Sequence, residues 1–343
     1  MTDRRVTIVD VARHAQVSTT TVSKVLRNAA GASPAARARV RQSMEELGYR
    51  PYAAARGMRG RTYTVGVMLP DIRNPFFADV LEGLHDQLHG TGYQLLHGTS
   101  WNREDTEASV TEAMIDHGLD GLVLIAPLAS RARLDRIARA VPTVVVGRHG
   151  RSAQYDTVTD DDHAGAHLVV NHLVGLGHRR IALIDHHETD ATRLAEMPNA
   201  VRALGYRDAM RAHGLAAEID VVTTTYTHDG GYLGARLLLE RPSLPTALFT
   251  GADVVAIGAL QALAEAGRSV PADISVAGYD NIALAAFDPV SLTTVDQAGR
   301  RIGGNAARLL LERCADRHAP TSHIRLSPTL VARRSTAPPA ARP

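Results

Sequence analysis

Cysteine and lysine are nearly absent from this chain of 343 residues. Its one cysteine, Cys314, excludes an internal disulfide, and its one lysine, Lys24, leaves the rest of the chain without lysine Schiff-base chemistry or a phosphate-loop lysine. The sequence also lacks an apolar run near the ~20 residues of a membrane span, and its first residues contain no apolar segment of signal length. We therefore expect a soluble cytoplasmic protein with no contact to a membrane.

Charge is divided unevenly along the chain. Residues 1–61 contain twelve Arg or Lys and four Asp or Glu, a net charge of +8. The remaining residues contain 26 basic and 32 acidic side chains, so the total of +2 conceals a polarised molecule. Clustered positive charge suits phosphate binding, because each neutralised phosphate releases counterions into solution. The N-terminal part is thus expected to bind nucleic acid, and a basic face that contacts only solvent is the plainer alternative.

The same N-terminal residues have the pattern of a helix-turn-helix. Thr7, with Asp10 three residues later, can cap a first helix. Ser18 offers a second cap, and the apolar positions of residues 19–26 form one stripe. The side chains left facing outward are Thr19, Thr20, Ser23 and Lys24. Two short helices joined by a tight turn can place the second helix in a DNA major groove, and a third helix is expected from Ser33 to a stop at Gly48.

From Tyr63 onward, short apolar runs alternate with longer helical stretches. The predicted strands are residues 65–69, 94–96, 121–125, 143–146, 181–184, 221–224, 247–250 and 274–277. Regular alternation predicts parallel sheets covered by helices on both faces, here twice. Two such lobes leave a cleft at the carboxyl ends of their strands, where open parallel sheets bind ligands.

Nine segments of the chain, in order, resemble the lactose-repressor (LacI/GalR) family of bacterial transcription regulators. They include Val17-Ser18-Thr19-Thr20-Thr21-Val22-Ser23, Leu47-Gly48-Tyr49-Arg50-Pro51, Asn74-Pro75-Phe76-Phe77, Leu176-Gly177-His178-Arg179-Arg180 and Gly278-Tyr279-Asp280-Asn281. The resemblance spans nearly the full length. It implies an all-α headpiece at residues 1–50, a hinge helix or linker at 51–61, an α/β core of two parallel-sheet subdomains at 62–336 that resembles periplasmic binding proteins, and a disordered tail at 337–343.

Within that core, the resemblance implies two subdomains that each draw on two stretches of the chain. The N-subdomain is expected from about residues 62–160 and 291–321, and the C-subdomain from about 161–290 and 322–336.

The resemblance further implies a homodimer whose two headpieces read a roughly palindromic DNA operator as a transcriptional regulator, most often a repressor. In this chain, Thr19, Thr20 and Lys24 would face base edges, and Thr7, Ser18, Thr21 and Ser23 would contact phosphates. These roles suit the chemistry, since hydroxyls donate to phosphate oxygens and a lysine can donate to guanine.

The hinge segment would lie at the minor groove through Ala55, Arg56 and Met58. An apolar side chain such as that of Met58 can part a base step and bend the duplex. Gly57 weakens a helix that is already short, so we expect this segment to be ordered only when DNA holds it.

Between the two lobes, the resemblance places a small-molecule effector that alters DNA affinity. The matching positions are Phe76, Phe77, Arg148, Arg202, Tyr226 and Asp280. Carboxylate and guanidinium groups can chelate vicinal hydroxyls, and aromatic rings can cover the apolar face of a sugar. We therefore favour a sugar or sugar derivative over a nucleobase and expect no cofactor.

The sequence disfavours an enzyme, a transport receptor and a metal site. An enzyme is disfavoured because no Gly-x-Ser-x-Gly elbow, His-Glu-x-x-His pair or lysine-containing phosphate loop is present. A transport receptor would resemble the two-lobed body, but a basic headpiece stands where a secretion signal would be expected. His186, His187, Glu188 and Asp190 have metal-ligand character, yet adjacent residues on extended chain point apart, so a metal is not expected there.

Overall fold

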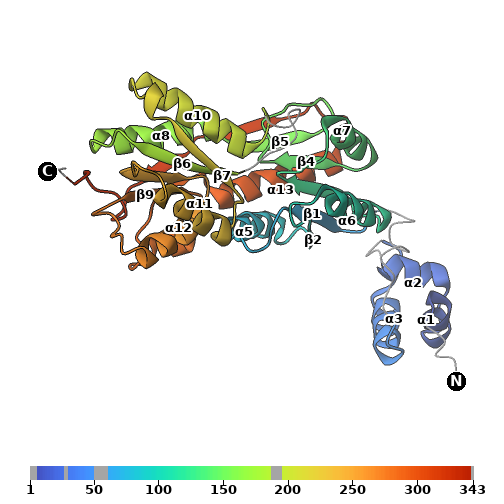
Figure 1. Ribbon diagram of the computed structural model, residues 1–343. Helices are drawn as coiled ribbons and strands as arrows, with labels where there is room; N and C mark the ends of the chain where they lie inside the picture. Colours follow the sequence, from blue (N-terminus) through green and yellow to red (C-terminus); the bar gives the residue numbers. More distant parts are fainter. Residues whose placement is uncertain (1–5, 27–29, 50–60, 187–194, 341–343) are drawn as a thin grey trace. The chain divides into compact units, whose positions relative to one another are not determined.

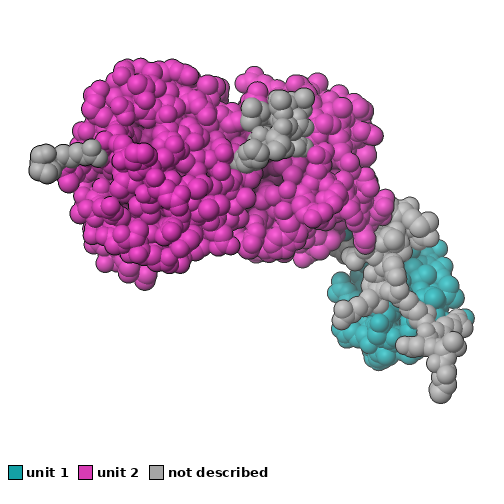
Figure 2. Space-filling model, viewed as in Figure 1, with its two compact units in different colours: residues 1–62 teal, residues 63–343 magenta. Residues whose placement is uncertain are grey.

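The computed structural model describes residues 6–26, 30–49, 61–186 and 195–340. They belong to two compact units, residues 1–62 and residues 63–343, which Figure 2 shows in separate colours. The hinge segment, with Ala55, Arg56 and Met58, lies outside the described residues. No helix in the described part of the chain is long and apolar enough to cross a membrane.

Three helices make up the first unit: α1 (Ile8–His14), α2 (Thr19–Leu26) and α3 (Pro34–Glu46). The predicted cap of α1 is present, since the Thr7 hydroxyl accepts from the Asp10 amide at 3.4 Å and an Asp10 carboxylate oxygen accepts from the Thr7 amide at 2.9 Å. The third helix begins as predicted, with the Ser33 hydroxyl accepting from the Ala36 amide at 3.2 Å. It stops before Gly48, whose φ of 61° suits glycine. The helix-turn-helix and its third helix are therefore confirmed.

A small apolar core joins these three helices. Its fully or nearly buried members are Val11, Ala12, Ala15, Val22, Val25 and Val40. Helix α2 packs against both α1 and α3, and its buried residues are Val22, Ser23 and Val25. Ser23 is only 8% exposed, so the expectation that it faces outward is wrong, and its proposed phosphate contact loses its geometric basis.

The second unit contains two six-stranded sheets (Figure 1). The first has the order β11-β5-β4-β3-β1-β2, with all neighbours parallel. Its strands are β1 (Thr64–Leu69), β2 (Gln94–Thr99), β3 (Gly121–Ile125), β4 (Thr143–Val146), β5 (Asp156–Asp160) and β11 (His323–Leu326).

The second sheet has the order β12-β10-β9-β8-β6-β7, in which β12 runs antiparallel to β10 and the other neighbours are parallel. Its strands are β6 (Ile181–His186), β7 (Asp220–Thr224), β8 (Ala247–Thr250), β9 (Ser275–Tyr279), β10 (Thr293–Asp296) and β12 (Thr329–Val331).

Helices cover both faces of each sheet. On the first sheet, α5 (Phe76–Leu88) and α13 (Gly299–Ala315) pack together on one face, and α6 (Glu104–Asp116) and α7 (Arg131–Ala140) cover the other. Side chains alternate along β1 accordingly: Val67 joins the α5 side and Met68 joins the α6 side.

The second sheet is covered in the same way. On one face lie α8 (Asp162–Gly175) and α10 (Pro198–Ala212), and on the other lie α11 (His228–Leu239) and α12 (Asp253–Glu265). Two short 3₁₀ helices, Ala216–Glu218 and Ala283–Ala286, complete the described elements.

All eight predicted strands are present, but the predicted subdomain boundaries differ from the topology. Strand β10 was assigned to the N-subdomain and lies in the second sheet, whereas β11 was assigned to the C-subdomain and lies in the first. The chain therefore crosses between the lobes after β5, after β10 and after β11. Because β5, β10, β11 and β12 are short and carry polar residues, none formed an apolar run that could mark the crossing.

The C-terminal residues are also more ordered than expected. The Ala337 amide donates to the Ser275 hydroxyl at 3.0 Å, and the Ala337 carbonyl lies 2.9 Å from Nε2 of His178. The expectation of a disordered tail is wrong for residues 337–340, because these contacts fix the start of the tail against the second lobe. Residues 341–343 lie outside the described part.

Candidate functional site

In the first unit, the start of α2 presents hydroxyl groups. Thr19 and Thr20 are exposed there. The Ser18 hydroxyl accepts from the Thr21 amide at 3.1 Å and lies 2.9 Å from the Thr21 hydroxyl, so the predicted second cap is present. These groups stand at the positive end of the helix dipole, which favours an anion such as phosphate.

Thr7 and Lys24 are two further described headpiece residues that were predicted to contact DNA. Thr7 is exposed and donates its hydroxyl to Asp10 at 2.6 Å. Lys24 is half-buried, and its side chain runs beside Gly31, where an added Cβ would come within 3.2 Å of Nζ. Gly31 has a φ of 95°, so both its conformation and the space it leaves suit glycine. Gly31 therefore leaves room for the lysine side chain.

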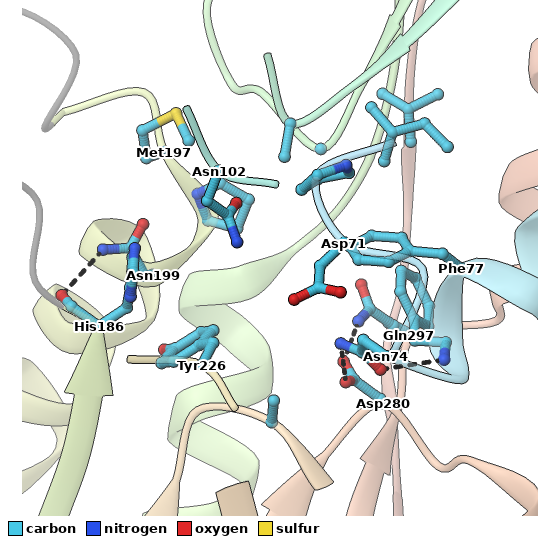
Figure 3. A pocket seen from close by; sticks show the side chains of 18 of the residues that line it. Asp71, Asn74, Phe77, Asn102, His186, Met197, Asn199, Tyr226, Asp280 and Gln297 are labelled. Atoms are coloured by element: carbon cyan, nitrogen blue, oxygen red, sulfur yellow. Dashed lines mark hydrogen bonds between the residues drawn. The ribbon is translucent and has the colours of Figure 1, made fainter. Parts of the chain in front are cut away.

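In the second unit, a cavity of about 130 Å³ lies between the two lobes (Figure 3). Its lining residues follow the carboxyl ends of strands in both sheets: Asp71 follows β1, Ala126 follows β3, His186 ends β6, Ala252 follows β8 and Asp280 follows β9. This position agrees with the expected cleft of open parallel sheets. A volume of this order has room for a small ring compound.

Five of the six predicted effector residues line this cavity, and one does not. Those present are Phe76, Phe77, Arg202, Tyr226 and Asp280. The side chain of Arg148 is only 3% exposed and turns away from the cavity. It donates to the backbone carbonyls of Pro127 and Ala129 and pairs with Glu196 at 3.0 Å. Arg148 follows β4 at the expected edge of the sheet, but these hydrogen bonds keep its side chain out of the cavity lining.

Several lining residues were not predicted. They are Asp71, Asn74, Asn102, Asp160, His186, Met197, Asn199 and Gln297, among others. Asn74 stands inside a segment that resembles the family, and the position of Asp71 and Asn74 just after β1 was the available signal. Gln297 had none, because it follows the unpredicted strand β10.

Asp280 is held by two side-chain amides, that of Asn74, which follows β1 of the first sheet, and that of Gln297, which follows β10 of the second. Gln297 donates to its Oδ1 at 2.5 Å, and Asn74 donates to its Oδ2 at 3.5 Å. The Asn74 amide is itself oriented, because its oxygen accepts from the Phe76 backbone N–H at 3.0 Å. Burial raises the pKa of Asp280 to about 7. Near neutral pH the group can therefore accept or donate a hydrogen bond.

Arg202 contributes a positive charge that the protein already balances. Its Nε donates to Asp162 at 2.5 Å, Nη1 donates to the Gly251 carbonyl, and the guanidinium lies 3.9 Å from the Tyr279 ring centroid. Burial lowers the pKa of Arg202, but Asp162, together with Tyr279, Tyr226 and Asp160, raises it well above its usual value. His149 adds a second hydrogen bond to Asp162 at 2.7 Å.

A tyrosine and a histidine form the wall from the second lobe. The Tyr226 hydroxyl donates to Asp185 at 3.0 Å, and burial raises the pKa of Asp185 to about 6. The His186 and Tyr226 ring centroids are 5.2 Å apart. Of the four residues with metal-ligand character in the sequence, His187, Glu188 and Asp190 lie outside the described part of the chain. Within that part, no group of three His, Cys, Asp or Glu side chains could hold a metal ion.

Comparisons with known proteins agree with both units. Residues 7–52 match the family model for bacterial regulatory proteins of the lacI family, and residues 170–336 match the periplasmic binding protein-like domain. The ribose operon repressor of Escherichia coli K12 is 33% identical, with 96% of this chain and 99% of the repressor covered. Catabolite control protein A of Priestia megaterium is 32% identical, with 96% and 99% covered.

Solved structures show the same likeness. A complex of the transcriptional regulator CelR with cellobiose is 29% identical with a TM-score of 0.69, covering 96% of this chain and all of that one. A LacI family regulator from Enterococcus faecium with bound ribose is 29% identical with a TM-score of 0.70, covering 80% and 99%. With relatives above 30% identity over nearly its whole length, a capped helix-turn-helix and a cavity between two parallel-sheet lobes, this chain belongs to the lacI family of bacterial regulatory proteins.

Proposed function

We propose that this DNA-binding regulator is a transcriptional repressor that binds a pseudo-palindromic operator as a homodimer and responds to a sugar or sugar derivative. The observation that carries the proposal is the presence, in one chain, of a basic helix-turn-helix and a cavity lined from two lobes. The relatives named above are transcription regulators, and two of the solved ones hold sugars. The proposed site of action is the cytoplasm, where the DNA lies.

For the DNA contacts, we assign base recognition to Thr19, Thr20 and Lys24. Both threonines are exposed at the start of α2, and Lys24 is the only lysine of the chain. Phosphate contacts are assigned to three exposed or half-exposed hydroxyls, those of Thr7, Ser18 and Thr21. Ser23 is left out of this set because it is buried. The hinge assignment to Ala55, Arg56 and Met58 remains a proposal that rests on the resemblance alone.

For the effector, aromatic and polar side chains have complementary tasks. Phe76, Phe77 and Tyr226 offer ring faces to the apolar side of a sugar ring. Asp280 and the amides of the lining can form hydrogen bonds with hydroxyls. We infer that the protein binds this compound without transforming it, since the lining groups are engaged in positioning bonds and the relatives are repressors.

Two measurements test the proposal. DNase footprinting of the full-length protein on fragments of its own genome at low salt should show a protected site with two related halves. A thermal-shift screen against neutral sugars and nucleosides should raise the melting temperature with at least one sugar, by mass action on the folded state. A chain that protects no fragment is not this regulator, and a response to nucleosides alone would replace the sugar with a nucleobase compound.

A further inference from the structure

We propose that Asp71 sets the charge selectivity of the cavity, so that it binds an uncharged polyhydroxyl compound and rejects the phosphorylated or carboxylated form of that compound. This inference rests on the proposed function, because it concerns the same cavity, and adds the chemical class of the effector. Asp71 was not among the residues predicted from the sequence to bind the effector.

Asp71 is placed so that a ligand would meet its carboxylate. The residue directly follows Pro70 at the end of β1, is nearly buried and lines the cavity. Figure 3 shows its carboxylate among the lining side chains, above Gln297, Asn74 and Asp280. A ligand in the cavity would therefore lie near this carboxylate.

Arg73 holds that carboxylate in its ionised form. The Arg73 backbone amide donates to Oδ1 at 2.9 Å, Nε donates to Oδ1 at 3.0 Å and Nη2 donates to Oδ2 at 2.6 Å. Burial alone would raise the pKa of Asp71, but the hydrogen bonds and charge of Arg73 lower it below its usual value. Nε also donates to Oδ2 at 3.1 Å, so each carboxylate oxygen accepts two hydrogen bonds from Arg73.

The arginine itself is held on the solvent side. Its side chain is 67% exposed, and its guanidinium carbon lies 5.6 Å from the centroid of the Trp101 ring. Arg73 is not among the residues that line the cavity. A ligand inside would therefore be close to the carboxylate, and the balancing charge would lie behind it, where water screens it.

The other charges of the lining do not compensate. Two more carboxyl groups, Asp160 and Asp280, line the cavity. Among the described residues, Arg202 is the one arginine in the lining. Its partner Asp162 is fully buried at 2.5 Å, so, unlike the exposed Arg73, it balances the charge without screening by water. The remaining basic side chain, His186, lies on the wall with Tyr226.

This distribution decides which ligands the cavity can hold. A phosphate or carboxylate would lose water and meet like charge in a medium of low dielectric constant, which is costly. An uncharged polyol has no such cost. Its hydroxyls can bond the amides of Asn74, Asn102 and Gln297.

Calorimetry on the full-length protein with matched probes tests the inference. The neutral probes are ribose, glucose and cellobiose, and the anionic probes are ribose 5-phosphate, glucose 6-phosphate and glucuronate. We expect at least one neutral probe to bind about tenfold or more tightly than its anionic counterpart. An anionic probe that binds as tightly as its parent sugar overturns the inference and leaves the proposed regulator intact. If no probe binds while operator binding persists, the sugar effector and this inference are both wrong.

Two substitutions with opposite effects assign the selectivity to Asp71. Asp71→Asn should strengthen binding of the anionic probe by about tenfold, which reduces the ratio of neutral-probe affinity to anionic-probe affinity. Arg73→Gln should increase this affinity ratio, because it leaves the Asp71 carboxylate without its balancing charge. Asp105→Asn is the matched control, because Asp105 also pairs with an arginine, Arg103 at 2.7 Å, but is 67% exposed and outside the cavity. The affinity ratio of this control variant should equal that of the wild type. An unchanged ratio in both Asp71 and Arg73 variants would refute the assignment.

Discussion

Arg202 and Asp162 form an ion pair in which the arginine Nε lies 2.5 Å from a carboxylate oxygen, and both side chains are almost fully buried. Each charge is tolerable in the interior only because the other is present. Arg202 comes from α10 and Asp162 begins α8, so the pair joins the two helices that cover one face of the second sheet. The effector cavity is therefore built on a pair that also stabilises the second lobe.

Breaking this pair should destabilise the protein strongly. Arg202→Met leaves Asp162 buried with only its hydrogen bond to His149, and we expect a loss of about 3–5 kcal/mol in the free energy of unfolding, measured by urea denaturation. The double variant Arg202→Met/Asp162→Asn should recover part of this loss, since no unpaired charge remains. Losses that simply add in the double variant would show that the two side chains act independently.

The pH dependence of stability should carry the signature of Asp185. Its pKa is raised by burial from 3.8 to about 6 in the folded protein. A raised pKa favours the folded state when the group is protonated, so this contribution is complete below about pH 4 and is lost as pH rises to about 6. Asp185→Asn can still accept from Tyr226 but cannot ionise.

We therefore expect the wild type to lose stability relative to Asp185→Asn between pH 4 and pH 6.5, by up to about 3 kcal/mol. Urea denaturation of both proteins at half-unit pH intervals measures this difference. If the wild type does not lose stability relative to Asp185→Asn as pH rises from 4 to 6.5, or gains stability instead, the assignment is wrong.

Arg148 should influence the effector through Glu196 rather than by contact. Glu196 pairs with Arg148 and precedes Met197 and Asn199, which line the cavity. Removing either member of the pair should shift this segment and weaken effector binding. In a double-mutant cycle with Arg148→Met and Glu196→Gln, we expect a coupling energy of about 0.5–3 kcal/mol in the calorimetric binding free energy. A ligand-contacting Arg148 would give additive losses instead.

On the DNA side, Lys24 should read bases rather than neutralise phosphate. Lys24→Ala is expected to reduce the discrimination between the operator and single-base variants by about 1–3 kcal/mol, measured by fluorescence anisotropy. Arg39→Ala on α3 is the control, because Arg39 is an exposed basic residue of the same unit outside α2. It should leave the discrimination unchanged. If Lys24→Ala weakens all sequences equally, the lysine contacts the phosphate backbone.

The strongest local patterns predicted the structure best. The Thr7 and Asp10 pair and the Ser33 start gave correct helix ends, because side-chain caps act within one turn of the chain. The long apolar strands were found for a similar reason, since burial on both faces leaves a continuous run. By contrast, β10 and β11 have few apolar residues, and their exchange between sheets depends on contacts far apart in sequence.

The cavity shows the same division. Phe76, Tyr226 and Asp280 were found by resemblance, since they occupy positions that match the family. Arg148 occupies such a position too, but its guanidinium pairs with Glu196 and not with the cavity. A local sequence pattern cannot predict a partner that is 48 residues away. Gln297 was missed because its place at the cavity depends on the crossing after β10.

Coupling between the cavity and the headpiece is the most direct test. Anisotropy with a footprinted operator should be measured for the full-length protein with and without a sugar that the cavity binds, and again for Asp280→Ala. We expect the sugar to change the operator affinity of the wild type by about 5-fold or more and to leave that of the variant unchanged. Operator affinity that is the same at zero and saturating sugar would contradict effector control of this regulator.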